Sequence, residues 1–518
     1  MIARPPGDRP AVRMPIYGFE KELCRDMKTF EAALHGGPTF CGEVRRWAKT
    51  HPQKTAVVSE NQQITYQELD RRSSMLAAYL LGQGIHREDI VGISTGRSVE
   101  TVVAILGIWK AGAAYVYLNA SMTKDVNSHI LEDCRCPLVL DHDQMELAMK
   151  TDDPGDLDFS VPDGLALVVY TSGSTAAPKG VMLEHRAVYQ MALNQGPMEV
   201  TPEDHYCVFA SFSFVASVSD LVGAIMGGAT CYIIGEAYRR DIHKLEKYLI
   251  DNQITICFLP PHMAIKLTQE TPPGLSLRLL LAGSDCVHNL CSDQFRIFHV
   301  YGATEAGSLI AHYPVTERRT SYPVGKLNPS LRGYIVDEAG KPVPKGEAGE
   351  LWLAGPQISR GYVGLRELTA AAYALNPFTQ EEGYQRVLKT ADIVREDENG
   401  DLVYVARKGR MYKIRGFRVE SRAVELTLLQ YPGITEAVVI AFPDSGGTNI
   451  LCGYYTAEET IGPKELKAYL RERLPYYMVP TCMFQLERFP LNANNKVDRK
   501  QLRPPAELDD HKYLEQTY

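Results

Sequence analysis

Alternation of short apolar runs with helical segments is the feature of this sequence that most constrains its fold. Ile90–Ile93 is an apolar run, as expected for a strand buried on both faces. Val99–Lys110 has the spacing of a helix, with Ser98 placed to cap its start. Further short runs follow at Leu165–Tyr170, His205–Ala210, Thr255–Leu259, Leu279–Ala282 and Phe298–Tyr301. A repeated strand–helix order is typical of α/β folds, so we predict a large α/β body with parallel sheets.

The composition changes near Ser330, where glycines punctuate alternating strand patterns as far as Gly364. Such spacing favours a β-rich subdomain with tight turns. The last hundred residues read as a compact α+β unit, with strand patterns at Glu436–Phe442 and Cys452–Tyr455. We therefore predict an N-terminal body over 1–408 and a small C-terminal lid over 409–518.

Length, charge and cysteine spacing exclude several classes of protein. A chain of 518 residues needs more than one hydrophobic core. Its net charge of −8 gives no general attraction to nucleic acid or to acidic membranes. The most apolar stretch, Leu221–Ile234, is shorter than the ~20 residues of a membrane span, and the N-terminus lacks the apolar core of a signal peptide. The eleven cysteines include no CxxC pair. We expect a cytoplasmic protein with neither nucleic acid nor membrane as a partner.

A loop rich in glycine and hydroxyl residues carries the clearest chemical signal. The apolar run LVVY leads into a loop that is followed by Pro-Lys-Gly, and the loop residues are Thr171, Ser172, Gly173, Ser174 and Thr175. Small residues allow several backbone N–H groups to face one anion, and Lys179 adds a positive charge. The spacing is not that of a Walker A loop. The pattern predicts a polyphosphate site.

The stretch Leu167–His185 resembles the phosphate loop of the adenylate-forming superfamily, although Ala176 stands where that family usually has glycine. This superfamily includes acyl-CoA synthetases, luciferases and the adenylation domains of nonribosomal peptide synthetases. The similarity extends from about Phe40 to Leu502. The sequences of the segments GFRVE, LPYYMVP and NNKVDRK are most similar to those of the synthetase adenylation domains. The resemblance implies that ATP and Mg²⁺ are used.

HVYGATEAG resembles the family's YGxTE motif. In that family the tyrosine, here Tyr301, stacks on adenine, and Gly302 follows it in the nucleotide site. The threonine, Thr304, meets the α-phosphate, and the glutamate, Glu305, helps to hold Mg²⁺. An aromatic face suits a purine, and hard oxygen donors suit Mg²⁺.

Three further motifs complete the resemblance. KTADIVRED is similar to the family's TGD motif, with Ala391 in place of glycine, and its Asp392 would hold the ribose hydroxyls. Arg407 takes the place of an arginine near the ribose and phosphate. The family's hinge residue falls on Gly409, where aspartate or lysine is usual. Lys496 stands at the position of the catalytic lysine, which neutralises charge on the reacting phosphoryl and carboxylate groups.

One position bears directly on the substrate. Val215 stands where amino-acid-activating domains carry the aspartate that pairs with the α-ammonium group. A buried valine cannot compensate a cation, so an ordinary α-amino acid is disfavoured. When the family's pocket positions are assigned in their order along the chain, the residues expected to line the acid pocket are Val215, Ala216, Ser219, Phe258, Leu280, Ala282, Val300, Ser308 and Leu309. Asp220 lies about 140° round a helix from Val215 and is expected to point elsewhere unless the segment bends.

The sequence therefore predicts an enzyme that adenylates a carboxylic acid, releases pyrophosphate and transfers the acyl group to a thiol. The acid is expected to be hydrophobic, and α-keto, α-hydroxy, β-amino, aryl and alkyl acids stay open. The predicted acceptor is the phosphopantetheine of a carrier protein. One alternative is an acyl-CoA synthetase that uses free CoA. A second is an inactive scaffold that retains the fold, which the presence of Lys179, Glu305, Asp392 and Lys496 argues against.

Overall fold

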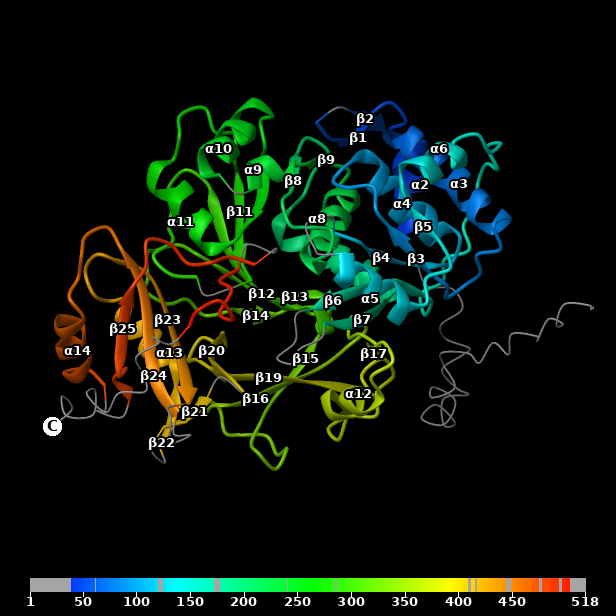
Figure 1. The fold of residues 1–518 in the computed structure, drawn as a ribbon. Coiled ribbons are helices and arrows are strands. Elements are labelled where there is room, and N and C mark those ends of the chain that lie inside the picture. Colours follow the sequence, from blue (N-terminus) through cyan, green and yellow to red (C-terminus); the bar gives the residue numbers. More distant parts are fainter. Residues whose placement is uncertain are drawn as a thin grey trace, which may run out of the picture.

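The structure is a computed structural model. It describes residues 39–60, 62–119, 124–171, 178–239, 241–284, 287–408, 411–414, 417–443, 449–474, 478–492 and 496–503. Within these residues the strands form five sheets, three in the body and two in the C-terminal unit (Figure 1).

The largest sheet contains nine strands in the order β14-β13-β12-β11-β10-β8-β9-β1-β2. Its members are β1 (Thr55–Val58), β2 (Gln63–Thr65), β8 (His205–Val208), β9 (Thr230–Ile233), β10 (Ile256–Leu259), β11 (Leu279–Gly283), β12 (Arg296–Ala303), β13 (Ser308–Pro314) and β14 (Lys326–Leu327). The strands from β1 to β12 pair in parallel, as the apolar runs predict. Both edges are antiparallel, through the β12–β13, β13–β14 and β1–β2 pairs.

A second sheet contains six strands in the order β17-β7-β6-β4-β3-β5. Its members are β3 (Ile90–Ile93), β4 (Ala114–Tyr117), β5 (Val139–Leu140), β6 (Leu165–Thr171), β7 (Lys179–Glu184) and β17 (Gly361–Tyr362). Strands β5, β3, β4 and β6 are parallel, whereas β6, β7 and β17 are antiparallel. The predicted phosphate loop connects β6 to β7, where Thr171 pairs with Lys179.

Helices pack on both sheets. The body helices are α2 (Phe40–Thr50), α3 (Tyr66–Gly82), α4 (Val99–Lys110), α5 (Lys124–Cys134), α6 (His142–Ala148), α7 (His185–Leu193), α8 (Val215–Met226), α9 (Glu236–Arg239), α10 (Ile242–Asp251), α11 (Pro261–Glu270) and α12 (Arg366–Ala372), with 3₁₀ turns η1 (Gly196–Met198) and η2 (Thr304–Ala306). Helix α4 starts where the sequence predicts, since the Ser98 side chain accepts a hydrogen bond from the Thr101 N–H. No helix among the described residues is long and apolar enough to cross a bilayer.

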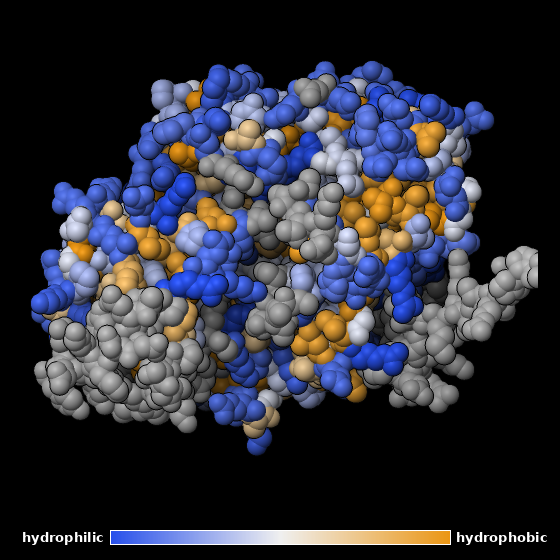
Figure 2. All heavy atoms as spheres, in the orientation of Figure 1, coloured by the Kyte–Doolittle hydropathy of each residue, from blue (hydrophilic) through white to orange (hydrophobic). Residues whose placement is uncertain are grey.

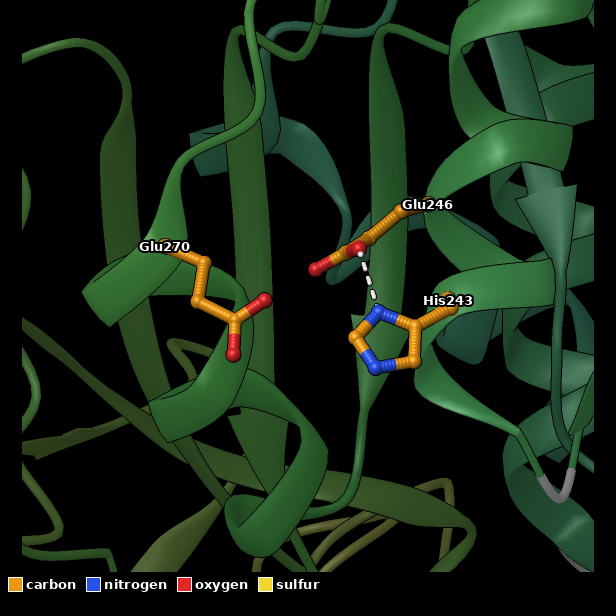
Figure 3. A group of neighbouring side chains, drawn as sticks. All are labelled: His243, Glu246 and Glu270. Carbon is orange, nitrogen blue, oxygen red and sulfur yellow. Dashed lines mark ion pairs between the residues drawn. The ribbon is translucent and has the colours of Figure 1, made fainter.

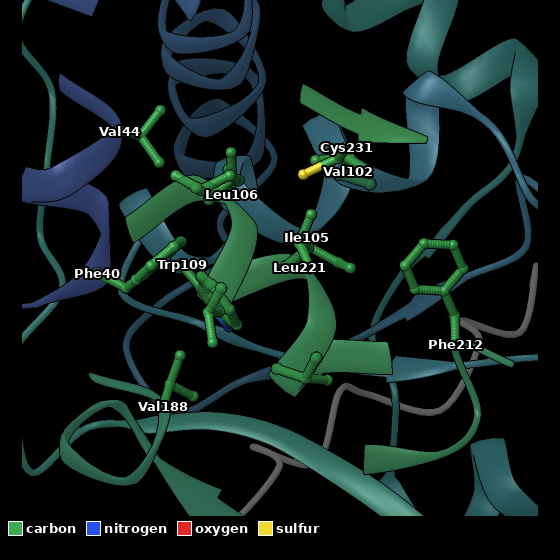
Figure 4. Packing of buried hydrophobic residues seen from close by; sticks show 14 of the residues in the cluster. Phe40, Val44, Val102, Ile105, Leu106, Trp109, Val188, Phe212, Leu221 and Cys231 are labelled. Carbon is green, nitrogen blue, oxygen red and sulfur yellow. The ribbon is translucent and has the colours of Figure 1, made fainter. Parts of the chain in front are cut away.

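The main core lies where α4 and α8 meet the two parallel sheets, and it includes residues of β4 and β6 as well as β8 and β10. Figure 4 shows Ile105 and Trp109 of α4 near Leu221 of α8. Because α4 is buried on all sides, its apolar character is continuous rather than striped. Trp109 donates its indole N–H to the Ala166 carbonyl at 2.8 Å, so this polar atom is satisfied within the core.

The region rich in glycine forms the predicted β subdomain, an antiparallel sheet in the order β15-β16-β19-β18 with β20 paired to β19. Its strands are β15 (Arg332–Val336), β16 (Gly349–Ala354), β18 (Tyr373–Leu375), β19 (Arg386–Glu396) and β20 (Leu402–Arg407). The C-terminal unit contains β21 (Met411–Ile414), β22 (Phe417–Glu420), α13 (Ser421–Leu428), β23 (Ile434–Pro443), β24 (Asn449–Ala457), α14 (Pro463–Arg471) and β25 (Cys482–Gln485). Its own core packs α13 and α14 against β23 and β24. The expected division into a body and a smaller C-terminal unit is therefore seen.

Candidate active site

A buried carboxylate joins two sheets of the body. Asp392 of β19 is 3% exposed and accepts a hydrogen bond from the Tyr301 hydroxyl at 2.5 Å. Arg407, its register partner on β20, donates to the other carboxylate oxygen at 3.0 Å. Burial, followed by the nearby Asp392 carboxylate, raises the pKa of Tyr301 well above its usual value, so the phenol stays a donor. The three residues predicted for adenine, ribose and phosphate thus lie in one cluster.

Strand β19 is irregular directly before Asp392, where its pairing with β16 shifts register. Ala391, at the position where the family has glycine, adopts φ +61°, a conformation that disfavours a Cβ. Its N–H donates to Glu350 at 3.0 Å, and its carbonyl accepts from the Lys408 N–H at 2.7 Å. The Lys408 ammonium also pairs with Glu350 at 2.6 Å. These contacts hold the irregular part of β19 that orients Asp392, and they anchor the chain beside Gly409, which itself lies outside the described residues.

A second chain of contacts links the start of β7 to η2. Thr304 begins η2 and is buried, and Glu305 follows it. Glu305 accepts a hydrogen bond from the Tyr362 hydroxyl at 2.9 Å. The Lys179 ammonium lies 5.1 Å from the centre of the same tyrosine ring. The loop residues Ser172, Gly173, Ser174 and Thr175 are outside the described part, so their predicted phosphate contacts stay a prediction, while Lys179 and Glu305 do lie close enough to share one neighbour.

Gly302 is required by close packing. A Cβ at this position would lie 2.0 Å from the Ser308 carbonyl oxygen, because β12 and β13 approach each other at a register shift. Ser308 itself has φ +71°. The glycine of the YGxTE-like motif therefore permits the tight β12–β13 connection, which starts after Tyr301 and contains Thr304 in η2.

Lys496 reaches the body from the C-terminal unit. Its ammonium lies 4.6 Å from the centre of the Phe214 ring, within the range of a cation–π contact. Figure 1 shows the red C-terminal segment extending towards the body. Phe214 is the N-cap residue of α8, directly before Val215. The predicted catalytic lysine is thus placed at the edge of the predicted acid pocket.

Most of the predicted pocket residues share one region. Val215, Phe258 and Leu309 belong to the main core cluster, with Ala216 and Val300 packed against it. Ser219 is buried and accepts a hydrogen bond from Gln195 at 2.9 Å. Leu280 and Ala282 differ, because they belong to the cluster formed with α10 and α11. A small cavity opens beside Phe214, and its lining is Phe209, Ala210, Ser211, Phe214, Arg239, Phe258, Pro260 and Ser284.

Asp220 does not share the environment of Val215. It is buried, and its Oδ1 accepts a hydrogen bond from the Tyr206 hydroxyl of β8 at 3.4 Å. Burial raises the pKa of its carboxyl well above the usual value. Asp220 thus points towards the sheet, as the helical spacing predicts, and in its neutral form it is a poor partner for a cation.

Three residues near the site were not predicted from the sequence: Phe214, Tyr362 and Glu350. Tyr362 and Glu350 stand in the glycine-rich region between Ser330 and Gly364, for which the sequence predicts a β-rich subdomain and no site residue. Phe214 directly precedes Val215, a predicted pocket residue, so its position in the sequence could have identified it as a residue near the site. The contacts that give these residues importance join distant segments, which spacing alone does not show.

Two protein-family models match separate parts of this chain. The family model described as AMP-binding enzyme matches residues 44–363, and the AMP-binding enzyme C-terminal domain matches residues 423–496. Tyrocidine synthase 1 of Brevibacillus parabrevis is 34% identical over 484 residues, which cover 88% of this chain and 44% of that protein. Bacitracin synthase 1 of Bacillus licheniformis is 34% identical over 475 residues, which cover 88% of this chain and 9% of that protein. The chain spans less than half the length of these curated relatives.

Solved structures share the fold. Klebsiella oxytoca NpsA, in complex with 3-hydroxyanthranilyl-AMSN, has a TM-score of 0.80 at 23% identity and covers 90% of this chain and 98% of its own. AB3403, a four-domain nonribosomal peptide synthetase bound to AMP and glycine, has a TM-score of 0.77 at 28% identity. It covers 93% of this chain and 38% of its own.

Proposed function

This chain belongs to the AMP-binding enzyme family and is an AMP-forming ligase, and we propose a reaction in two steps. In the first step a carboxylic acid and ATP form an acyl-AMP and pyrophosphate. In the second step the acyl group is transferred to a carrier-protein thiol and AMP is released. The observation that carries the first step is the position of Lys496 beside Phe214, the residue directly before Val215 of the predicted acid pocket. Asp392 and its hydrogen-bond partners Tyr301 and Arg407 form the nucleotide-binding part of the proposed site.

The side chains suit each part of the adenylation reaction. Asp392, oriented by two donors, accepts hydrogen bonds from ribose hydroxyls. A carboxylate oxygen of the acid attacks the α-phosphorus, the bond to the bridging oxygen breaks, and pyrophosphate leaves. The Lys496 ammonium stabilises the negative charge at the new bond. Glu305 offers an oxygen ligand for Mg²⁺, which would neutralise phosphate charge.

The acid pocket disfavours an α-ammonium group for two reasons. Val215 offers no negative charge, and it is the first residue of α8, which has no acidic residue in its first turn. The start of a helix carries partial positive charge, so an ammonium group there is repelled as well as unpaired. Asp220 is engaged with Tyr206 and compensates neither effect. We therefore propose a hydrophobic acid without an α-ammonium group, of the α-keto, α-hydroxy, aryl or alkyl kind, and a β-amino acid only if another acceptor meets its amine.

ATP–pyrophosphate exchange with matched acids tests this substrate class. An α-amino acid and its α-keto and α-hydroxy analogues share one side chain and differ only at the α-carbon, whereas the β-amino isomer carries its amine one carbon further from the carboxyl group. We expect exchange with the keto or hydroxy acid to exceed that with the α-amino acid. A preference for the α-amino acid of about tenfold, or 1.4 kcal/mol, would contradict the argument from Val215. A folded protein that exchanges with no acid would favour the scaffold alternative.

The acceptor requires a separate experiment. The synthetase-like C-terminal motifs and the much longer synthases among the relatives support a carrier protein. After adenylation, a phosphopantetheinylated carrier should be acylated faster than free CoA, as followed by intact-protein mass spectrometry and by acyl-CoA formation. Efficient acyl-CoA formation without carrier loading would instead support the acyl-CoA synthetase alternative.

A further inference from the structure

A histidine and two glutamates meet between α10 and α11, on elements that the adenylation site does not use. His243 and Glu246 lie three residues apart on α10, and Glu270 is the last residue of α11. One ligand atom from each residue lies within 4.8 Å of the other two. Figure 3 shows the imidazole ring and both carboxylates directed into the same gap between the two helices. His243 and Glu270 are exposed, and hydrophilic residues dominate this face in Figure 2.

Glu246 provides an independent indication that the gap receives a cation. The residue is only 8% exposed, and its Oε1 atom has no hydrogen-bond partner among the described residues. Figure 3 shows its carboxylate facing that of Glu270. A buried carboxylate oxygen without a partner is costly, and a second carboxylate facing it adds repulsion. A bound cation removes both costs at once.

The spacing fits a transition metal. The His243 Nδ1 atom lies 3.5 Å from Oε2 of Glu246, the second oxygen of the carboxylate whose Oε1 has no hydrogen-bond partner among the described residues. Two ligands at the usual zinc distances of about 2.0–2.2 Å in tetrahedral geometry are themselves about 3.4 Å apart. Glu270 must move inward only slightly, and its exposed side chain at a helix end allows this movement. Imidazole suits zinc and its neighbours in the first transition row, whereas Mg²⁺ prefers oxygen ligands.

We propose that His243, Glu246 and Glu270 bind one Zn²⁺ ion, or a chemically similar divalent transition metal, which joins α10 to α11. The three protein ligands leave a fourth position for water. The two helices cover one side of the nine-stranded sheet through a shared core cluster. Helix α11 starts directly after β10 and Pro260, which borders the cavity beside Phe214. The metal thus stabilises the helix pair that supports this wall of the cavity, and it is separate from the Mg²⁺ position predicted at Glu305.

Metal binding by the full chain, without an affinity tag and without nucleotide, tests the proposal. Equilibrium dialysis against Zn²⁺, followed by elemental analysis, should give one more bound equivalent for the wild type than for His243→Ala or Glu270→Gln. Zn²⁺ should also raise the melting temperature of the wild type and leave that of both variants unchanged. An excess of Mg²⁺ should not displace the ion. Glu270→Gln alters an exposed side chain, so it keeps the test valid if changes at buried Glu246 impair folding.

His142 provides a matched control. It is an exposed histidine between two glutamates, with its Nδ1 3.0 Å from Glu100 and its Nε2 3.7 Å from Glu146. Because the two carboxylates face opposite ring nitrogens, the three residues cannot share one metal. His142→Ala should therefore retain the wild-type number of zinc equivalents. Equal zinc binding by the wild type and His243→Ala, or no binding by the wild type, would overturn the proposal.

Discussion

The contact between Lys496 and Phe214 predicts a coupling that can be measured. The ammonium lies 4.6 Å from the ring centre, and both side chains are half-buried. Cation–π contacts contribute about 0.5–1 kcal/mol when exposed and about 2 kcal/mol when desolvated, so we expect about 1 kcal/mol here. If Phe214 orients the ammonium towards the reacting atoms, Phe214→Leu should lower kcat for adenylation roughly fivefold.

The assay is ATP–pyrophosphate exchange at saturating ATP and acid, in four proteins: wild type, Phe214→Leu, Lys496→Ala and the double variant. Lys496→Ala should reduce exchange by roughly 10²–10³-fold, because it removes charge stabilisation at the transition state. In that background Phe214→Leu should have no further effect on kcat, since the ring has no ammonium to orient. Phe258→Leu serves as the control, because Phe258 lines the same cavity from β10.

Two results would refute this reasoning. If Phe214→Leu costs the same factor with and without Lys496, the ring acts on the acid pocket alone, as Phe258 is expected to do. If folded Lys496→Ala retains near-normal exchange, the assignment of the lysine itself is wrong. A change confined to KM for the acid would likewise place Phe214 in substrate binding only.

Three further substitutions test other parts of the structure. Tyr301→Phe retains the aromatic face and loses the hydrogen bond to Asp392, so KM for ATP should rise roughly tenfold, about 1.4 kcal/mol; an unchanged KM would show that the tyrosine only stacks. Burial lowers the pKa of His185 to about 3, below the value near 6.5 expected in the unfolded chain, so its contribution to stability is present above pH 6.5 and is lost as the pH falls. His185→Leu should therefore reduce the loss of unfolding free energy between pH 7 and pH 5 by about 2 kcal/mol, as measured by urea titration, and an unchanged loss would contradict this. Val215→Asp should shift exchange towards α-amino acids by about tenfold, and an unaltered preference would place the amine elsewhere.

The parallel core of the fold was predictable because its elements are buried on all sides. Val99–Lys110 has the predicted bounds, since a continuous apolar segment with a serine before it leaves few alternatives. The antiparallel edges were not predicted, and neither were β21, β22 and β25. These strands are short or half-exposed, so their patterns differ little from those of loops. The pairing of a strand depends on which distant segment of the chain lies beside it, and the residues of the strand itself do not indicate that segment.

The site was predictable only as a set of separate motifs. Tyr301, Asp392 and Arg407 were each identified by resemblance, but their mutual hydrogen bonds follow from the meeting of two sheets. Ala391 is a second example of a feature that the motifs do not reveal. An alanine in place of glycine does not suggest a positive φ, yet the backbone keeps φ +61° through contacts with Glu350 and Lys408. Tertiary contacts supply what local conformational preference does not.

Phe214 contributes both to the contact with Lys496 and to the lining of a cavity. The Lys496 ammonium contacts the Phe214 ring, and the same ring lines a small cavity together with Phe258. A carboxylate placed towards Lys496 is stabilised both by the ammonium and by the start of α8. A substituent beyond it must be accommodated by Val215 and its apolar neighbours, which offer no charge to a cation. The same arrangement that stabilises the reacting carboxylate therefore disfavours an ammonium group one carbon away, and this links the proposed substrate class to the position of the lysine.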